Sequence, residues 1–310
     1  MQNDDRSVLT ARLALLVAIL AVSTSSIMIR FAQQEAPSLA IAAYRLCIAA
    51  IILIPAVWGK REELKRVKRT DWAWMGVSGV FLALHFASWI TSLSFSTVAS
   101  SVVFVSTTPL WVALITTLIL KQPLKRELAL GLGVALLGAG LIGGSDLLHF
   151  ENGVLAPFDW ETMLKANAIK GDALALCGAI MGAGYMVIGR QVRQGLSIIS
   201  YTFIVYGVAA LVLIGMAGFS GAVLTGYSQS FLFWVVLLAV VPQTAGHSVI
   251  NWSLKYLSAA FVSVALLGEP IGSTVLAMFF FGEFPGLIKI AGAVLILAGI
   301  ILSSRSEPRQ

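Results

Sequence analysis

The sequence has little charge, few cysteines and none of the common patterns of catalytic or metal-binding residues. Charged residues make up 12% of the 310 residues, about half of the roughly 25% usual in a soluble domain. Cys47 and Cys177 both fall in apolar stretches, where a thiol acts as a small apolar side chain, and neither suggests a disulfide. There is no His-Glu-x-x-His pattern, no Cys/His cluster and no phosphate-binding loop. We therefore expect no catalytic residue, metal or cofactor, although His85, His247 and Glu269 leave an intramembrane enzyme open as an alternative.

Apolar residues fill what remains of the chain. They make up 58% of the sequence, and the mean hydropathy is +0.90. Hydropathy divides the chain into ten stretches of roughly 17–25 residues, the length that crosses a bilayer core, and leaves no room for a soluble domain. This pattern predicts an all-α membrane protein with ten transmembrane helices. The predicted spans are 10–29, 38–58, 72–92, 97–120, 127–145, 171–189, 198–219, 231–250, 257–281 and 285–303.

The two halves of the sequence repeat each other. A single shift of 161 positions, without gaps, superimposes prolines, glycines and short motifs across three predicted helices. The repeat predicts a first five-helix unit at 1–146, an extracytoplasmic linker at 147–170 and a second five-helix unit at 171–310. Because five is odd, the second unit is inverted in the membrane, which is the architecture of carriers that work by alternating access. The matched pairs are Pro109 and Pro270, Gly131 and Gly292, Gly138 and Gly299, Ser92-Leu93 and Ser253-Leu254, and Ala99 and Ala260.

Positive charge is distributed unequally between the two ends of the predicted bundle. Sixteen Lys and Arg residues lie on the side of the termini and four on the other side, with one more, Arg45, inside a span. The positive-inside rule therefore places both termini in the cytoplasm. Topology explains the net charge of +6, so no nucleic-acid partner is expected. The linker is read as a tether between the two units, with a short amphipathic surface helix as the alternative.

Pro109 and Pro270 each fall near the middle of a span. Proline has no N–H and clashes with the carbonyl four residues earlier, so Val105 and Leu266 lose their helical partners. In a bilayer these carbonyls need water, a neighbouring helix or a ligand. The prolines therefore predict kinks that shape a central cavity, with simple bending of the two helices as the alternative.

Glu269 is a carboxylate placed near the middle of a span. An acid at that depth carries a penalty of roughly 2.5–3.5 kcal/mol, so it is expected to face the interior of the bundle. Three roles are open for it: carrying a proton, binding the amine of a substrate, or accepting hydrogen bonds that hold the kinked helix.

Polar side chains form matched stripes on the third and eighth spans. His85, Trp89 and Ser92 follow one face of the third span, while the eighth carries Gln243, His247 and Asn251 at intervals of four. Because lipid cannot form hydrogen bonds, both stripes are predicted to point inward and to line the substrate pathway. Hydrogen bonding between helices is the alternative.

Further candidates for the pathway lie in the first, fourth and sixth spans. These are Thr24, Met28, Thr108, Trp111 and Tyr185.

Arg45 and four glycines have more than one interpretation. The side chain of Arg45, in the second span, can reach the outer interface as a helix-end anchor, or it can serve as a gate or as a partner for a substrate carboxylate. The seven-residue spacing of the matched glycines predicts smooth faces for close packing within the bundle, with dimerisation as the alternative.

Short motifs recur in the fourth and fifth spans and in the ninth and tenth. The later copy contains Leu266-Leu267-Gly268-Glu269-Pro270 and Gly282-Glu283, and the degenerate earlier copy contains Thr107-Thr108-Pro109-Leu110. Together with Ala43-Tyr44-Arg45-Leu46, these motifs resemble the EamA-type permeases of the drug/metabolite transporter superfamily. The chain departs from the pattern at Thr108 and at Lys121-Gln122. The resemblance implies a ten-span carrier, usually an exporter of amino acids or related small metabolites, with aromatic and neutral amino acids as the first candidates.

These observations combine into a functional prediction. The chain is expected to be a secondary transporter of the cytoplasmic (inner) membrane that exports amino acids or related metabolites by alternating access, as a monomer or a homodimer. Because no ATP-binding domain is present, transport must be passive, exchange-based or driven by an ion gradient. Uptake or exchange of a small polar metabolite is the alternative. An ion channel is disfavoured because no repeated filter or ring of charges is seen.

Overall fold

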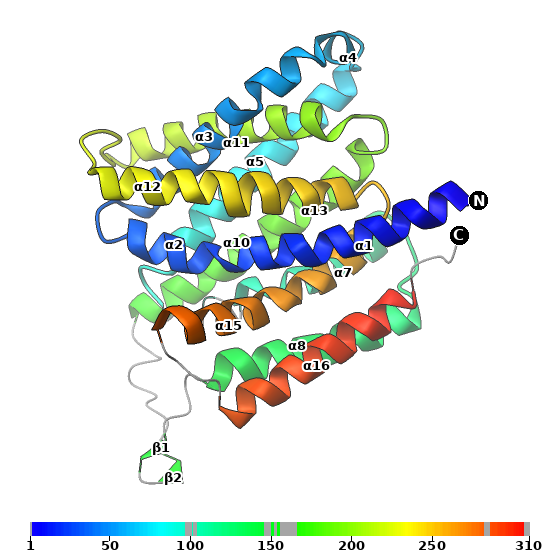
Figure 1. Cartoon of the computed structure of the whole chain (residues 1–310), viewed down its shortest axis with the longest axis vertical. Helices are drawn as coiled ribbons and strands as arrows, with labels where there is room; N and C mark the ends of the chain where they lie inside the picture. The colour runs from blue at the N-terminus through cyan, green and yellow to red at the C-terminus, as the bar shows by residue number, and fades with distance from the viewer. Residues whose placement is uncertain are drawn as a thin grey trace.

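The computed structural model is a bundle of helices with both termini at the same end (Figure 1). It describes residues 2–96, 101, 104–145, 150–151, 154–155, 166–281 and 286–306. The helices of the first half are α1 (Gln2–Ser23), α2 (Ser25–Ala32), α3 (Ser38–Trp58), α4 (Arg61–Lys65), α5 (Arg69–Ser92), α7 (Thr108–Leu114), the π-helix η1 (Ile115–Ile119) and α8 (Arg126–Ser145). Those of the second half are α10 (Ala166–Val192), α11 (Ile198–Phe219), α12 (Gln229–Leu238), the π-helix η2 (Ala239–His247), α13 (Ser248–Ser253), α14 (Ala259–Ala265), the 3-10 helix η3 (Leu266–Gly268), α15 (Glu269–Phe281) and α16 (Leu287–Ser304).

Eight helical segments of the described chain are long and apolar enough to cross a membrane. They correspond to eight of the ten predicted spans, and Ser38–Trp58 and Ile198–Phe219 agree with the prediction at both ends. The predicted span 97–120 is represented by a shorter apolar helix, Thr108–Ile119, and its beginning lies largely outside the described residues. The span at 127–145 corresponds to α8. The chain is thus an all-helical membrane protein with two repeats, and the count of ten spans stays a prediction.

The helices pack in pairs related by the repeat. Under the shift of 161 positions α3 corresponds to α11 and α8 to α16, and the members of each pair contact each other. Contacts between helices that are not equivalent also occur twice, once with each unit supplying the first helix. The first helix of the second unit, α10, packs along α5, while α1 packs along η2 and α13, the equivalents of α5. A pseudo-twofold axis between the two units produces this reciprocal pattern.

The glycines of α8 and α16 show that the two helices run in opposite directions. A Cβ atom at Gly131 would lie 2.5 Å from the carbonyl oxygen of Gly299, and one at Gly138 would lie 2.5 Å from that of Gly292. The earlier residue of one helix therefore faces the later residue of the other. From the sequence, these glycines were compatible with packing inside the bundle or with dimerisation. In the structure they pack α8 against α16 within one chain.

The predicted linker contains two short strands. β1 (Phe150–Glu151) pairs antiparallel with β2 (Val154–Leu155), and Phe150 lies opposite Leu155. Figure 1 shows this hairpin at the end of the molecule opposite the termini, where a linker between two five-helix units is expected. Helix α10 begins at Ala166, inside the stretch assigned to the linker. Most of the segment proposed as a surface helix lies outside the described residues, and the unit boundaries stay predictions.

The two prolines matched by the repeat, Pro109 and Pro270, lie where their helices are interrupted. Pro109 lies in the first turn of α7, where its missing N–H leaves no helical bond unmade. In the second unit the chain passes from α14 through the 3-10 turn η3 into α15, which begins one residue before Pro270. The carbonyls predicted to lose their partners are satisfied locally. Val105 accepts a hydrogen bond of 2.7 Å from Oγ1 of Thr108, and Leu266 accepts one from the N–H of Glu269.

Candidate functional site

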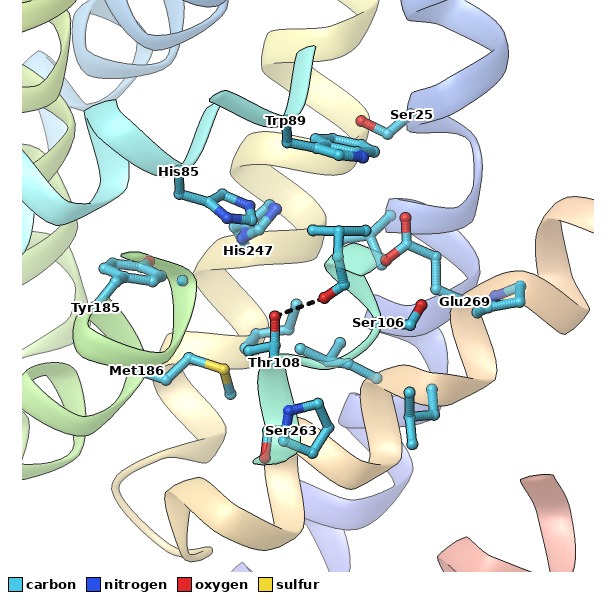
Figure 2. Close-up of a pocket in the computed structure, with 18 of the residues that line it drawn as sticks. Ser25, His85, Trp89, Ser106, Thr108, Tyr185, Met186, His247, Ser263 and Glu269 are labelled. Atoms are coloured by element: carbon cyan, nitrogen blue, oxygen red, sulfur yellow. Dashed lines mark hydrogen bonds between the residues drawn. The ribbon is translucent and has the colours of Figure 1, made fainter. Parts of the chain in front are cut away.

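A cavity of about 160 Å³ opens where the two interrupted helices meet. It lies among segments from six predicted spans: α1 and α2, α5, the region around α7, α10, η2 with α13, and α14 with α15 (Figure 2). The lining residues are Val22, Ser25, Ser26, His85, Trp89, Val105, Ser106, Thr108, Pro109, Gly182, Tyr185, Met186, His247, Ile250, Ser263, Leu266, Leu267, Glu269, Pro270 and Ser273.

The lining follows the internal repeat. Six pairs of lining residues are related by the shift of 161 positions, so both units contribute equivalent surfaces to one cavity. Such a cavity lies on the pseudo-twofold axis, where a carrier with inverted repeats holds its substrate. The pairs are Val105 and Leu266, Ser106 and Leu267, Thr108 and Glu269, Pro109 and Pro270, Ser25 and Met186, and Trp89 and Ile250.

Aromatic rings form one side of the cavity. His85 and Trp89 lie on α5 with ring centroids 6.2 Å apart and nearly parallel planes. Nδ1 of His85 lies 2.8 Å from the carbonyl oxygen of Gly178, which can only accept, so Nδ1 carries the proton in this contact. His247 reaches the same side from η2, and Figure 2 shows its ring beside that of His85, with Tyr185 on the adjoining α10. These rings offer a flat, largely apolar surface with polar edges to a small solute.

Glu269 supplies the negative charge of the cavity. Figure 2 shows its carboxylate pointing from α15 into the cavity, on the side of Trp89 and Ser25. The carboxylate makes no hydrogen bond or ion pair with any described residue, and none of the described lining residues is Lys or Arg. An unpaired acid on an apolar surface attracts a cation, such as an ammonium group.

Arg45 lies behind the lining and not at a membrane interface. Its guanidinium is fully buried; Nε donates a 2.8 Å hydrogen bond to Oε1 of Gln243, and Nη1 donates one of 2.9 Å to Oγ of Ser25. The ring of Phe86 lies under the guanidinium, 4.2 Å from Cζ to the ring centroid. This position differs from that of a snorkelling anchor, because the side chain points to the centre of the bundle, where fixed partners replace water.

The polar stripe of the eighth span does not present one face. His247 lines the cavity, whereas Gln243 and Asn251 are buried beside it. The stripe runs through the π-helix η2, in which the N–H of Ser248 bonds to the carbonyl of Gln243 five residues earlier. A π-turn holds more residues than an α-turn, so the angles between side chains differ from those of the regular α-helix assumed in predicting the stripe. Asn251 donates to the hydroxyl of Tyr185 and, over 2.8 Å, to the carbonyl of His247.

Other predicted residues also lie away from the cavity wall. Thr24 donates a hydrogen bond of 2.7 Å to the carbonyl of Ala21 and lies against the sulfur of Met28. The indole of Trp111 donates to the hydroxyl of Thr107. Sequence reasoning did not single out Ser106 or Ser263, which do line the cavity.

The hydroxyl of Thr108 is expected to stabilise the break in the fourth span. Without it, the carbonyl of Val105 loses its described donor, because Pro109 has no N–H to offer. We expect Thr108→Val to lower the stability of the detergent-solubilised protein by about 1–3 kcal/mol, the typical cost of an unsatisfied buried polar group. Thr274→Val is the matched control, because Thr274 also bonds to a carbonyl of its own helix, that of Pro270, within the continuous helix α15. Equal melting temperatures for the two variants would contradict this role.

A second cavity of about 340 Å³ lies at the end of the bundle that carries the termini. Val8 and Ser306 line it, as do Lys125 and Arg190. Both cavities are lined by the segment that includes α7 and η1, by α10 and by α14. On the first of these, Thr108 lines the central cavity, Thr116 lines the second, and the fully buried Val112 lies one turn from each. The two cavities are therefore stacked along the same helices.

Comparison with known proteins agrees with this architecture. The model of the EamA-like transporter family matches the chain twice, at residues 9–144 and 169–305. The chain is 24% identical to the uncharacterized transporter YyaM of Bacillus subtilis (strain 168) over 85% of this chain and 83% of YyaM. It is 25% identical to the pseudopaline exporter CntI of Pseudomonas aeruginosa (strain UCBPP-PA14) over 94% of this chain and 96% of CntI.

The fold has also been seen in a solved structure. A crystal structure of another protein superimposes with a TM-score of 0.76 and 17% sequence identity, over 96% of this chain and 97% of the other. Two copies of the family pattern, placed on two packed and inverted helical units, account for nearly the whole sequence. The chain is a membrane transporter and belongs to the EamA-like transporter family.

Proposed function

We propose that this transporter exports amino acids or related small metabolites from the cytoplasm across the inner membrane by alternating access. The observation that carries the proposal is the central cavity, which equivalent residues of both units line and which combines an acid with aromatic rings. Because the two units are inverted copies, rocking them about this cavity exposes it to either side in turn. Thr108, His85, Trp89, Tyr185, His247 and Glu269 are the proposed contacts with the substrate.

The size and chemistry of the cavity support a small, amine-bearing cargo. Its volume of about 160 Å³ is below the roughly 300–1,000 Å³ of pockets for drug-sized ligands. Glu269 offers a negative charge to an ammonium group, and Trp89 and Tyr185 add aromatic surface to which a cation is also attracted. The relative CntI, which carries the name of an exporter, supports outward transport.

The proposed orientation places the second cavity on the cytoplasmic side. In the predicted topology, sixteen of the 21 Lys and Arg residues fall on the side of the termini, and the positive-inside rule assigns that side to the cytoplasm. The cargo would enter through the second cavity and pass the layer that contains Val112 when the units rock. Uptake or exchange uses the same site in the opposite direction, so counterflow measured from each side of oriented vesicles decides between these functions.

Counterflow in proteoliposomes, with a panel of amino acids, nucleosides and sugars, tests the proposal. Saturable exchange of an amino acid supports it, whereas formation of a new product from the panel would indicate an enzyme. We expect Trp89→Ala and His247→Ala to lower transport efficiency at least about tenfold, equivalent to about 1.4 kcal/mol. Trp74→Ala is the matched control, because Trp74 lies on the same helix but is 52% exposed on the outer face of the bundle. Correctly inserted Trp89→Ala and His247→Ala proteins that transport as well as Trp74→Ala would place the site elsewhere.

A further inference from the structure

The second cavity differs in charge from the central cavity. Lys125, from the loop between η1 and α8, and Arg190, near the end of α10, both line it. Neutral side chains that can donate hydrogen bonds accompany these two cations, and none of the described lining residues is Asp or Glu. A cavity with such a lining attracts an anion. The neutral donors are Thr116, Gln122, Gln191, Tyr256 and Ser258.

Backbone carbonyl groups help to position the two cations. Nζ of Lys125 donates a hydrogen bond of 2.6 Å to the carbonyl oxygen of Ser306, and Nη1 of Arg190 donates one to that of Leu254. A carbonyl group has no net charge, so these two contacts orient the cations without neutralising them. The nearby Glu127 is exposed, and it forms no ion pair with Lys125 among the described residues.

The internal repeat does not account for these positive charges. The shift of 161 positions relates Lys125 to Gly286 and Arg190 to Ile29. In the central cavity, by contrast, equivalent residues of both units contribute to the lining. The architecture that the two units share therefore needs no cation at either position.

Apolar side chains form much of the remaining lining and continue onto the outer surface of the bundle. Leu124 lines the cavity and is also 38% exposed. Leu118 and Ile119 of η1, directly before the lining residue Leu120, are 70% and 71% exposed. The cavity thus borders both a pair of cations and an apolar surface. The apolar lining residues are Val8, Leu120, Leu124, Leu128, Val187, Ala259 and Ala260.

We propose that the second cavity binds the headgroup of an anionic phospholipid. The phosphate would contact Lys125 and Arg190, and the acyl chains would follow the apolar surface that includes Leu124. Inorganic phosphate would match the cations but leave the apolar part of the lining uncovered. Basic pockets between transmembrane helices on the cytoplasmic side suit anionic headgroups, and the proposed orientation places this cavity on that side. The inference goes beyond the proposed function and does not depend on it, because it concerns the second cavity and not the cargo.

Native mass spectrometry of the full chain in detergent tests the lipid site. The probes are dioleoylphosphatidylglycerol and dioleoylphosphatidylcholine, which have the same acyl chains but differ in net charge. The parent should bind phosphatidylglycerol at least about tenfold more tightly, equivalent to about 1.4 kcal/mol. Lys125→Gln should weaken this binding at least about fivefold, equivalent to about 1 kcal/mol, and should leave phosphatidylcholine within about twofold. Lys125→Arg keeps the charge and should bind like the parent.

Arg126→Gln is the matched control for the charge of the surface. Arg126 is the next residue along the chain and is exposed, but it does not line the cavity. This variant should bind phosphatidylglycerol within about twofold of the parent. Equal losses in Lys125→Gln and Arg126→Gln would show that general surface charge attracts the lipid, and the site would be wrong. Equal affinities of the parent for the two lipids would also overturn it.

A second variant and a soluble anion complete the test. Arg190→Gln changes the cation supplied by the other unit, so its loss of affinity should be similar even if Lys125→Gln fails to fold. Inorganic phosphate at the concentration of the lipid should not displace phosphatidylglycerol. Displacement would assign the cavity to a soluble phosphate and overturn the lipid. Absence of amino-acid counterflow would contradict the proposed function and would leave these lipid measurements unchanged.

Discussion

Replacing Gly138 with leucine is expected to leave little folded protein. Gly138 on α8 faces α16 so closely that a Cβ atom would lie 2.5 Å from the carbonyl oxygen of Gly292 and 2.8 Å from the backbone nitrogen of Ile296. These are backbone atoms of a helix, which cannot turn aside as a flexible side chain can. The two helices would have to separate along their length, and close packing of small residues is a main source of helix association in a membrane. Overpacking typically costs about 1–3 kcal/mol where side chains can adjust, and we expect more than about 4 kcal/mol here.

A second glycine on the same helix provides the control for this prediction. Gly140 lies two residues further along α8, and a Cβ atom there would meet nothing within 4 Å. Gly140→Leu should therefore elute as a monodisperse species in detergent and melt near the parent temperature, while Gly138→Leu should aggregate or fail to insert. Gly138→Ala should be intermediate, because even one methyl group meets the backbone of α16. Similar melting temperatures for the two leucine variants would show that α8 and α16 do not approach each other in this way.

Neutralising Glu269 should remove most transport without unfolding the protein. Among the described residues, the carboxylate accepts no hydrogen bond, so the Glu269→Gln variant breaks no observed contact of the side chain. It does remove the negative charge that faces the cargo. Losing one partner of a buried charge pair typically costs about 2–5 kcal/mol, so we expect counterflow efficiency to fall at least about 30-fold. The thermal stability of the purified protein should stay close to that of the parent.

The proposed roles of Glu269 can be separated by further measurements. Glu127 is an exposed acid in the first turn of α8, and Glu127→Gln should transport normally. If Glu269 binds the amine of the cargo, Glu269→Gln should raise the concentration needed for half-maximal transport at every pH. If it carries the coupling proton, the variant should instead lose the pH dependence of flux. A large drop in melting temperature with unchanged transport would favour the third role, in which the side chain holds the kinked helix.

Much of the architecture could be predicted because a bilayer imposes simple rules. Helices must satisfy their own backbone groups there, so hydropathy located Ser38–Trp58 and Ile198–Phe219 to the residue. Likewise, the loss of an N–H at Pro109 and Pro270 depends only on the identity of proline, and both helices are interrupted at these residues. The spacing of 161 residues predicted two units, and the family model matches the chain twice.

The arrangement around the cavity could not be predicted in the same way, because it depends on helix rotation and on contacts between distant segments. Gln243 lies against Arg45 and not in the cavity wall, although regular α-helical spacing places it in line with His247, and the segment that carries both is the π-helix η2. The hydropathy of the second span is the same whether Arg45 points outward to the interface or inward to Ser25.

Local composition and the repeat thus established a two-unit membrane bundle with a kinked centre, because length, apolarity and proline act within a single helix. The packed structure was needed to show that α8 and α16 meet through glycines and that a buried arginine lies behind the central cavity. Those features depend on which faces of separate helices come together, and that is settled by the fit of side chains across the whole bundle.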